Sequence, residues 1–353
     1  MAKMIDVARH AGVSLKTVSR VLNNEPHVQD TLREKVRASV EELGYVPSAS
    51  ARSLRSRRSY CINLISHSLH STFVHAIQFG ALQACQEAGY RMMVSMLDPK
   101  AAQDPEFLEN WCEALVKSGK PDGVILVPPM SDDPEINAAF LRHDIPIARI
   151  GPNDIEDDNT SIIIDDREAA REMTTHLINT GHTRIGFVLG KPDQGATPAR
   201  YKGYCEALEA AGIELDETLV KPGMFDFESG LEAGDAYLTM PEPPTAVFAA
   251  NDDMAAGVLV AAHRMGVQVP DHISIVGFDD SEIAEKMWPA LTTVRQPLQA
   301  LGAQAIRVLT QSAAGSRSKL DPAGTCLPYE IVLRQSSSQA PNVAGLWRGV
   351  QAV

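Results

Sequence analysis

The sequence lacks any long run of apolar residues. Its longest uncharged apolar stretch, near residues 255–262, is far shorter than the roughly 20 residues that a membrane-spanning helix requires. The opening residues Met1, Ala2, Lys3 and Met4 also lack the apolar core of a secretory signal peptide. We therefore expect a cytoplasmic protein with no segment in a membrane.

Cysteine is scarce and irregularly spaced. The chain has five cysteines, an odd number, widely separated and each among apolar neighbours: Cys61, Cys85, Cys112, Cys205 and Cys326. A disulfide framework or a metal site is typically marked by an even number of cysteines or by closely spaced pairs. We therefore expect these residues to be reduced thiols.

The sequence signatures of nucleotide-dependent enzymes are absent. Three glycines, Gly186, Gly190 and Gly195, have the wrong spacing for a dinucleotide-binding loop, and no Walker lysine loop is present. The only histidine cluster follows an expected strand, where ligand contact or helix capping is more common than metal binding: His67, His70 and His75.

Three pairs of adjacent carboxylates each follow an expected strand: Asp165 and Asp166, Asp252 and Asp253, and Asp279 and Asp280. Each pair could equally cap the helix that follows. No nucleophile or base stands at a defined spacing from them. We therefore expect no catalysis, no metal and no cofactor.

Positive charge is in deficit over the whole chain. The 353 residues include 45 Asp and Glu against 32 Lys and Arg, a formal net charge of −13, which by itself argues against a nucleic-acid partner. However, residues 1–60 contain 11 basic and 6 acidic residues, a net +5, whereas residues 61–353 contain 21 and 39, a net −18. The length also predicts two or three domains. These counts indicate a small basic domain followed by a large acidic region.

The basic region has the pattern of a helix-turn-helix. An apolar-periodic segment, residues 5–11, stops at Gly12, and Ser14 can cap a second segment, residues 15–23. A third segment carries an apolar stripe that completes a three-helix core: Leu32, Val36, Val40 and Leu43.

The second segment is expected to have two different faces. Its apolar residues recur at helical spacing and should face the small core: Val18, Val21 and Leu22. Lys16 and Arg20, four residues apart, then share the opposite face. A basic helix face that is merely solvated is the alternative interpretation of these two residues.

Four motifs stand in close order in this region: IDVA at 5–8, AGVS at 11–14, TVSRVLN at 17–23 and LGYVP at 43–47. Together they closely resemble the DNA-binding domain of LacI-type transcription regulators. The resemblance implies that Leu15, Lys16 and Arg20 reach base edges in the major groove. It also implies that a second set of residues binds phosphates and sets the register: Ser14, Thr17, Ser19 and Asn23.

Residues 48–59 are expected to form a hinge helix and linker. Ser48 can cap a helix of about nine residues, which is too short to be stable alone because helix nucleation is costly. The sequence Arg52-Ser53-Leu54 resembles the family's hinge helix, which pairs with its two-fold mate in the DNA minor groove. The resemblance implies that Leu54 wedges between base steps and that Ala51 lies at the helix–helix contact. A basic flexible linker is the alternative.

From residue 60 the chain alternates short β-rich runs with amphipathic segments. The first expected strands are residues 61–66, 91–97, 123–127 and 145–150, with helices at 73–88, 105–118 and 134–143. After a polar connector at 152–159 the pattern begins again, with strands at 161–164, 184–189, 245–249 and 273–278 and helices at 168–180, 199–212, 229–239 and 254–265. Such alternation predicts right-handed βαβ units. We expect two doubly wound parallel-sheet lobes with a ligand cleft between them.

Three further motifs extend the resemblance to the large region: AANDxMAxG at 249–257, VGFDD at 276–280 and PALTTVxQP at 289–297. They resemble the effector domain of the LacI family and, through it, periplasmic sugar-binding proteins. The resemblance implies that Arg200, Asn251 and Asp279 hydrogen-bond the effector with Asp165 close by. It also implies that Phe73 and Phe225 wall the pocket, with Trp288 as a stacking surface.

Residue chemistry favours a sugar as the effector. Vicinal hydroxyls suit Arg, Asp and Asn, and the apolar ring face of a sugar suits aromatic side chains. Purine-responsive relatives have an arginine near Gln194, so the glutamine leans against a purine. The alternative structural roles are helix capping by Asn251 and Asp252 and packing by Phe73 and Trp288.

The expected architecture is an all-α helix-turn-helix domain with a hinge helix, followed by a two-lobed α/β body similar to periplasmic binding proteins. We expect the DNA-binding domain at 1–47, the hinge and linker at 48–59, the effector-binding and dimerisation domain at 60–340, and a tail at 341–353. Lobe one is expected to comprise 60–160 and 294–324, and lobe two 161–293 and 325–340. The tail has no leucine heptad, which favours a homodimer over a tetramer.

These expectations predict a homodimeric repressor of carbohydrate-use genes that leaves a pseudo-palindromic operator when a small sugar binds. One alternative is a corepressed regulator that responds to a nucleobase or another metabolite. A less favoured alternative is a small-molecule-binding protein or an enzyme with a basic N-terminal domain.

Overall fold

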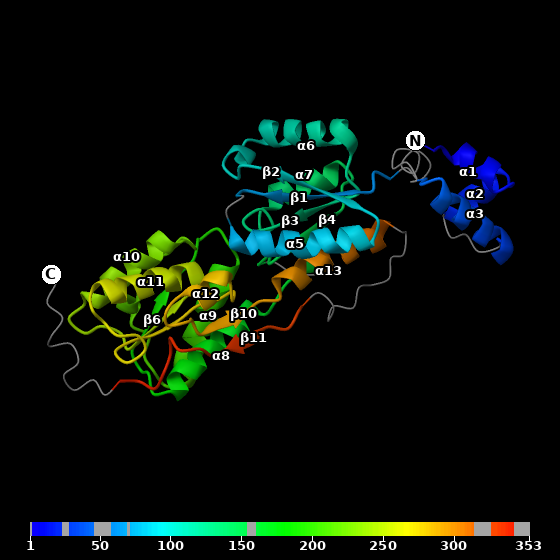
Figure 1. Ribbon diagram of the computed structural model, residues 1–353. Helices are drawn as coiled ribbons and strands as arrows, with labels where there is room; N and C mark the ends of the chain where they lie inside the picture. The colour runs from blue at the N-terminus through cyan, green and yellow to red at the C-terminus, as the bar shows by residue number, and fades with distance from the viewer. Residues whose placement is uncertain are drawn as a thin grey trace. The chain divides into compact units, whose positions relative to one another are not determined.

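The computed structural model describes residues 2–22, 28–45, 58–68, 71–153, 160–313 and 326–341 (Figure 1). The chain divides into two compact units, Met1–Tyr60 and Cys61–Val353. Most of the expected hinge, residues 48–57, and most of the expected tail, residues 342–353, lie outside the described residues.

The first unit contains three helices: α1 (Met4–His10), α2 (Leu15–Leu22) and α3 (Asp30–Glu42). Gly12, at φ +64°, ends α1, because the Val13 N–H donates to the Ala8 carbonyl at 3.0 Å and the Gly12 N–H to the Arg9 carbonyl at 3.3 Å. This left-handed position favours glycine. The expected helix-turn-helix is confirmed.

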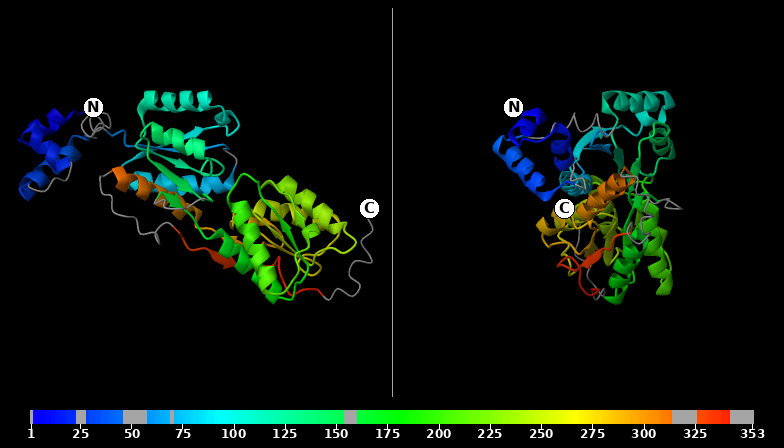
Figure 2. Two further views of the ribbon diagram at one scale, coloured as in Figure 1. Left: turned by 180° about the vertical axis from the view of Figure 1, so that it is seen from behind. Right: turned by 90° about the vertical axis from the view of Figure 1, so that its right-hand side faces the viewer.

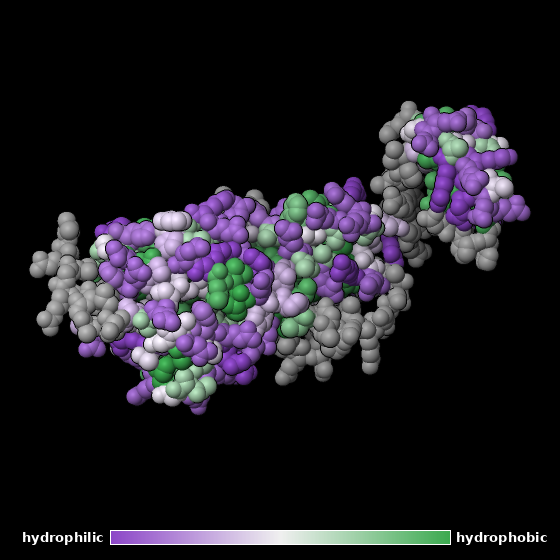
Figure 3. Space-filling view, turned by 60° about the horizontal axis from the view of Figure 1, so that its bottom comes forward, coloured by the Kyte–Doolittle hydropathy of each residue, from purple (hydrophilic) through white to green (hydrophobic). Residues whose placement is uncertain are grey.

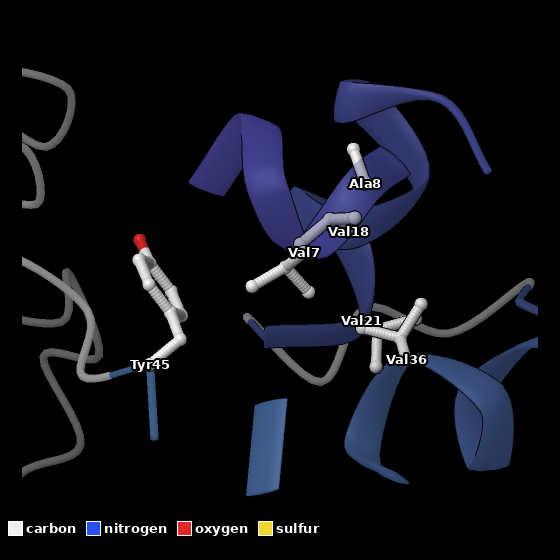
Figure 4. Packing of buried hydrophobic residues seen from close by; sticks show 6 residues of the cluster. All are labelled: Val7, Ala8, Val18, Val21, Val36 and Tyr45. Carbon is white, nitrogen blue, oxygen red and sulfur yellow. The ribbon is translucent and has the colours of Figure 1, made fainter. Parts of the chain in front are cut away.

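The core of this unit is small and built from short apolar side chains. Figure 4 shows its buried members gathered between the helices: Val7, Ala8, Val18, Val21, Val36 and Tyr45. The residues that pack around them at partial burial include three from the predicted stripes: Leu22, Val40 and Leu43. The predicted inward faces of α2 and α3 are therefore confirmed.

Lobe one of the second unit is a five-stranded parallel sheet in the order β2-β1-β3-β4-β5. Its strands are β1 (Cys61–Ser66), β2 (Arg91–Met96), β3 (Gly123–Leu126), β4 (Ile147–Ile150) and β5 (Ser161–Ile162). Helices α6 (Pro105–Gly119) and α7 (Pro134–Arg142) lie on one face of the sheet (Figures 1 and 2). Helices α5 (Thr72–Glu87) and α13 (Leu298–Ala313), far apart in the sequence, pack together on the other face.

Lobe two is a four-stranded parallel sheet in the order β7-β6-β8-β9. Its strands are β6 (Ile185–Val188), β7 (Val220–Lys221), β8 (Ala246–Ala249) and β9 (Ser274–Val276). The pair α8 (Asp166–Asn179) and α9 (Ala196–Ala210) covers one face, and the pair α10 (Phe227–Leu238) and α11 (Asp252–Arg264) covers the other (Figure 1). Short elements complete the unit: η1 (Ala101–Gln103), η2 (Glu217–Leu219) and α12 (Glu282–Lys286).

The chain passes between the lobes more than once. Strand β10 (Thr293–Arg295) pairs antiparallel with β11 (Glu330–Val332), and Ile163 forms a parallel bridge with Cys326. After β10 the chain enters α13 of lobe one. The two lobes are therefore each built from separate stretches of sequence.

One sheet assignment from the sequence is wrong. Residues 161–164 were expected to begin lobe two, but β5 pairs with β4 of lobe one, with Arg149 opposite Ser161 and Ile150 opposite Ile162. Lobe two therefore begins after β5. The reason is that an apolar run identifies a strand without identifying the strand with which it pairs.

On the face shown in Figure 3, hydrophilic residues predominate and hydrophobic residues form small patches. Within the described residues, no helix is both long enough and apolar enough to cross a membrane.

Candidate functional site

Helix α2 presents one polar face to solvent. Lys16 and Arg20 are exposed, and Leu15 at the start of the helix is 47% exposed. On the opposite side Val18 and Val21 are buried. The side chains that were predicted to reach base edges therefore all lie on the accessible side of α2.

The beginning of α2 is stabilised by local hydrogen bonds. The Thr17 N–H donates to Ser14 Oγ at 3.1 Å, and the hydroxyls of Ser14 and Thr17 lie 2.9 Å apart. Ser14 is thus an N-cap, as its sequence position predicted. Ser19, which was predicted to bind phosphate, is only 7% exposed. Three residues with predicted DNA contacts lie outside the described residues: Asn23, Ala51 and Leu54.

A second candidate site is a cavity of about 320 Å³ whose walls come from both lobes. It lies at the carboxyl ends of the strands, because its lining includes residues that come soon after them: His67 after β1, Pro128 after β3, Gly151 after β4, Lys191 after β6 and Asp279 after β9. Open parallel sheets bind ligands at this end. The predicted interlobe cleft is therefore present.

Arg200, on α9, is nearly buried and holds several groups of the cavity wall. Its Nε donates to Asp166 Oδ1 at 2.7 Å, and Nη1 donates to the Ala250 carbonyl. Nη1 also lies 3.8 Å from Asp279 Oδ1. The guanidinium carbon stacks 3.5 Å from the ring centroid of Phe278. Arg200 is therefore fixed in one orientation before any ligand binds.

Asp279 lies at the point where β9 ends and the chain turns towards α12. Its φ of 113° is unusual for a residue with a side chain, and its N–H donates to the Val294 carbonyl at 2.8 Å. The Gln296 amide donates to Asp279 Oδ1 at 2.6 Å. Burial raises the pKa of Asp279 to about 7, although Arg200 and Gln296 favour the ionised form.

Asn251 caps a helix and also lines the cavity. Its Oδ1 accepts a hydrogen bond from the Met254 N–H at 3.0 Å and so caps α11, while the residue also lines the cavity. Its Nδ2 donates to the Phe225 carbonyl at 3.1 Å. This bond holds Phe225, whose φ is +57°, in the cavity wall.

Phe225 requires a glycine opposite its ring. A Cβ atom at Gly190 would lie 1.9 Å from the ring carbon Cζ of Phe225. Phe73, in the first turn of α5, lines the cavity from lobe one. Aromatic rings of both lobes thus face the same space.

Two of the predicted residues, Asp165 and Trp288, are not among those that line the cavity. Asp165 is exposed and caps α8 by accepting the Glu168 N–H at 2.9 Å, and Asp166 lines the cavity in its place. The sequence identified this pair of aspartates. It did not show which of the two would cap the helix and which would face the cavity. Trp288 is 82% exposed and is not among the residues that line the cavity.

Sequence reasoning left several cavity residues without a role in effector binding: Asp166, Lys191, Asp253 and Gln296. Asp166 and Asp253 belong to the carboxylate pairs, and Gln296 belongs to a family-like motif, so signals existed for these three. Lys191 stands in a loop with no recognisable pattern. In the described part of the chain, no group of three or more His, Cys, Asp or Glu is arranged to bind a metal ion.

Comparison with known proteins connects both sites to one family. A family model described as bacterial regulatory proteins, lacI family, matches residues 3–48, and one described as a periplasmic binding protein-like domain matches residues 174–337. The HTH-type transcriptional regulator DegA of Bacillus subtilis (strain 168) is 33% identical over 94% of this chain and 97% of its own length.

Solved structures agree with this match. A transcriptional regulator CelR–cellobiose complex is 32% identical, with a TM-score of 0.71 over 96% of this chain and all of the other. The lac repressor dimer bound to operator and the anti-inducer ONPF is 28% identical, with a TM-score of 0.75 over 96% of this chain and 99% of the other.

Proposed function

The chain belongs to the LacI family of bacterial regulatory proteins and is a DNA-binding transcription regulator; we propose that it represses carbohydrate-use genes and leaves its operator when a small sugar binds the cavity. The observation that carries the proposal is the joint composition of the cavity wall. Arg200, Asp279 and Asn251 offer hydrogen bonds, and rings from both lobes, Phe73 and Phe225, offer apolar faces.

The functional groups of a sugar match the residues that line the cavity. Vicinal hydroxyls suit planar donors and carboxylates, and the C–H face of a sugar ring packs on aromatic rings. The cellobiose complex of the similar regulator supports a sugar. Gln194, which lines the cavity, cannot supply the charge of the arginine expected in a purine-responsive protein.

Binding to DNA in the cytoplasm would use the exposed face of α2. Arg20 is suited to pair with a guanine, and Lys16 and Leu15 are suited to contact neighbouring base edges. Ser14 and Thr17 would contact the DNA backbone. Asn23 would add a phosphate contact, and Ser19 could do so only after its side chain becomes accessible. Leu54 and Ala51 would act in the paired hinge helices of two subunits.

A homodimer would place two such domains on a pseudo-palindromic operator. Apolar side chains on neighbouring elements of lobe one support this assembly: Phe79 and Leu82 on α5 are 51% and 38% exposed, and Met93 and Met96 on the edge strand β2 are 48% and 54% exposed. A self-complementary patch of this kind is typical of a two-fold interface.

The two-lobed cavity provides a way for sugar binding to affect DNA binding. A sugar that contacts both lobes stabilises one relative arrangement of them, and this bias can unpair hinge helices that are barely stable alone. A ligand that strengthens DNA binding is the alternative. Which of the two applies depends on the sign of the change in operator affinity.

The proposal is tested by a thermal-shift screen of mono- and disaccharides, because a ligand of the folded state raises the melting midpoint. A sugar that raises the midpoint should also release the protein from operator DNA in a fluorescence anisotropy titration. A screen in which nucleobases bind and no sugar does would contradict the sugar response without affecting the DNA-binding role.

A further inference from the structure

The cavity contains more carboxylates than cationic groups. Its described lining includes two cations, Lys191 and Arg200, and four carboxylates: Asp166, Asp226, Asp253 and Asp279. The charge that a ligand meets depends on which of these groups are already neutralised within the protein.

Arg200 has little positive charge left for a ligand. Its Nε is bonded to Asp166 and its Nη1 lies between the Ala250 carbonyl and the Asp279 carboxylate. Its side chain is only 5% exposed. Because two buried carboxylates already balance the guanidinium, an additional anion would gain little from it.

One of the helix N-termini that line the cavity, that of α9, is also occupied. A helix N-terminus is a common binding site for anions, and α9 begins among lining residues, at Gln194 and Ala196. However, Asp132 from lobe one accepts the Gly195 N–H at 3.2 Å and the Asn153 N–H at 2.7 Å. The carboxylate of Asp132 therefore takes the place that a ligand phosphate would need.

Asp253 faces the cavity from the first turn of α11, and no ion pair to it is formed by the described side chains. Its nearest charged influences are also acidic, Asp226 and Glu228, and burial together with these two raises its pKa. Asp226 Oδ1 accepts a hydrogen bond from the Ser229 N–H, so Asp226 caps α10. Lys191 is the lining cation that could balance these groups, but the described lining still has four carboxylates against two cations and is therefore net negative.

We propose that Asp253 makes the cavity selective for polyhydroxylated effectors that carry no negative charge, either neutral sugars or amino sugars. This inference rests on the proposed function of the cavity as the effector site. A phosphate or carboxylate group would meet the unneutralised Asp253 and Asp226 in a space of low dielectric constant, where like charges repel strongly. A hydroxyl or ammonium group would instead donate a hydrogen bond to Asp253.

Matched probes test the charge selectivity directly. The full-length protein is titrated by calorimetry with glucose, glucosamine, glucuronate and glucose phosphate, and with the corresponding galactose and ribose series. Within any series that binds, we expect the neutral or amino member to bind at least about tenfold more tightly than the anionic members. Asp253→Asn should reduce the difference in affinity between the neutral or amino member and the anionic members. An anionic member that binds the wild type as tightly as its neutral partner overturns the inference.

A second measurement needs no ligand. The neutral variant Asp253→Asn should melt at a higher temperature than the wild type at pH 7, because it removes a partly buried charge next to other carboxylates. Asp271→Asn, at an exposed position of the same lobe, is the control and should leave the midpoint unchanged. A midpoint that falls or stays constant in Asp253→Asn would show that the carboxylate is neutralised, and the inference would fail.

The two proposals fail in different ways. If none of the sugar series binds or affects operator affinity, the sugar response is wrong, and the melting comparison still decides whether the wall is negative. If neutral and anionic sugars bind alike and both release the operator, the proposed function stands and the charge selectivity does not.

Discussion

The guanidinium of Arg200 and the carboxylate of Asp166 form a buried ion pair, with Nε donating to Oδ1 at 2.7 Å. The pair connects α9 to the first residue of α8, and Asp279 lies on the other side of the same guanidinium at 3.8 Å. Arg200 is therefore a structural counter-ion for two carboxylates as well as a candidate ligand-binding residue. Its substitution should change both stability and response.

Replacing Arg200 with alanine should destabilise the second unit by about 3–5 kcal/mol, because it leaves buried carboxylates without a counter-ion. The measurement is chemical denaturation followed by fluorescence. Lys202→Ala, an exposed position on the same helix, should have no comparable effect. The sugar response should also be lost, and an Arg200→Ala protein of wild-type stability would show that the pair contributes no net stabilisation.

Stability should depend on the ionisation of Asp279. Its pKa in the folded protein is about 7, above its ordinary value of 3.8, so the folded state binds this proton more tightly than the unfolded state. The resulting stabilisation is present below pH 3.8 and is lost as the pH rises towards and through about 7.

Asp279→Asn, which cannot ionise, should therefore lose less stability than the wild type between pH 5 and pH 8. Thermal melts of both proteins across this range measure the difference. Asp271→Asn should follow the wild-type profile. Parallel profiles for the wild type and Asp279→Asn would contradict the raised pKa.

Gly190→Ala should impair the cavity. The added Cβ would lie 1.9 Å from Phe225 Cζ, so the ring must move from its place in the wall. We expect weaker sugar binding in calorimetry with unchanged operator affinity, because the change is in the second unit. Unaltered sugar binding would show that Phe225 is not part of the site.

Leu54→Ala should weaken binding to the specific operator more than binding to random DNA, because a wedge between base steps acts only when the hinge helices pair in the minor groove. Competition titrations at constant salt give both affinities. Equal loss on the two DNAs would show that Leu54 contributes only to general attraction.

Arg20→Ala should lower specificity at one operator position by about 1–3 kcal/mol. Lys35→Ala, at an exposed position on α3, is the matched control because it also removes one positive charge. It should change the affinity for all DNA sequences by the same factor. If Arg20→Ala lowered the affinity for all operator variants equally, Arg20 would contact the DNA backbone and not a base.

The sequence alone determined the helix-turn-helix and most helices and strands of the two lobes. These features depend on local patterns: apolar spacing, the Gly12 turn, the Ser14 cap and β-rich runs between amphipathic segments. Arg200, Phe225, Asn251 and Asp279 were also identified, because their surroundings resemble family motifs. Helix α13 and strands β10 and β11 were not identified, since their pattern did not continue the alternation.

Only the tertiary structure decided which neighbouring residue reaches the cavity. Asp165 and Asp166 are adjacent in sequence, yet the first caps α8 and the second pairs with Arg200, more than thirty residues away. The sheet that β5 joins, the exposure of Trp288 and the position of Asp253 in the cavity wall likewise depend on contacts between distant segments. Local patterns predict the conformation of a segment, whereas the residues that meet in a cavity are set by how the lobes pack.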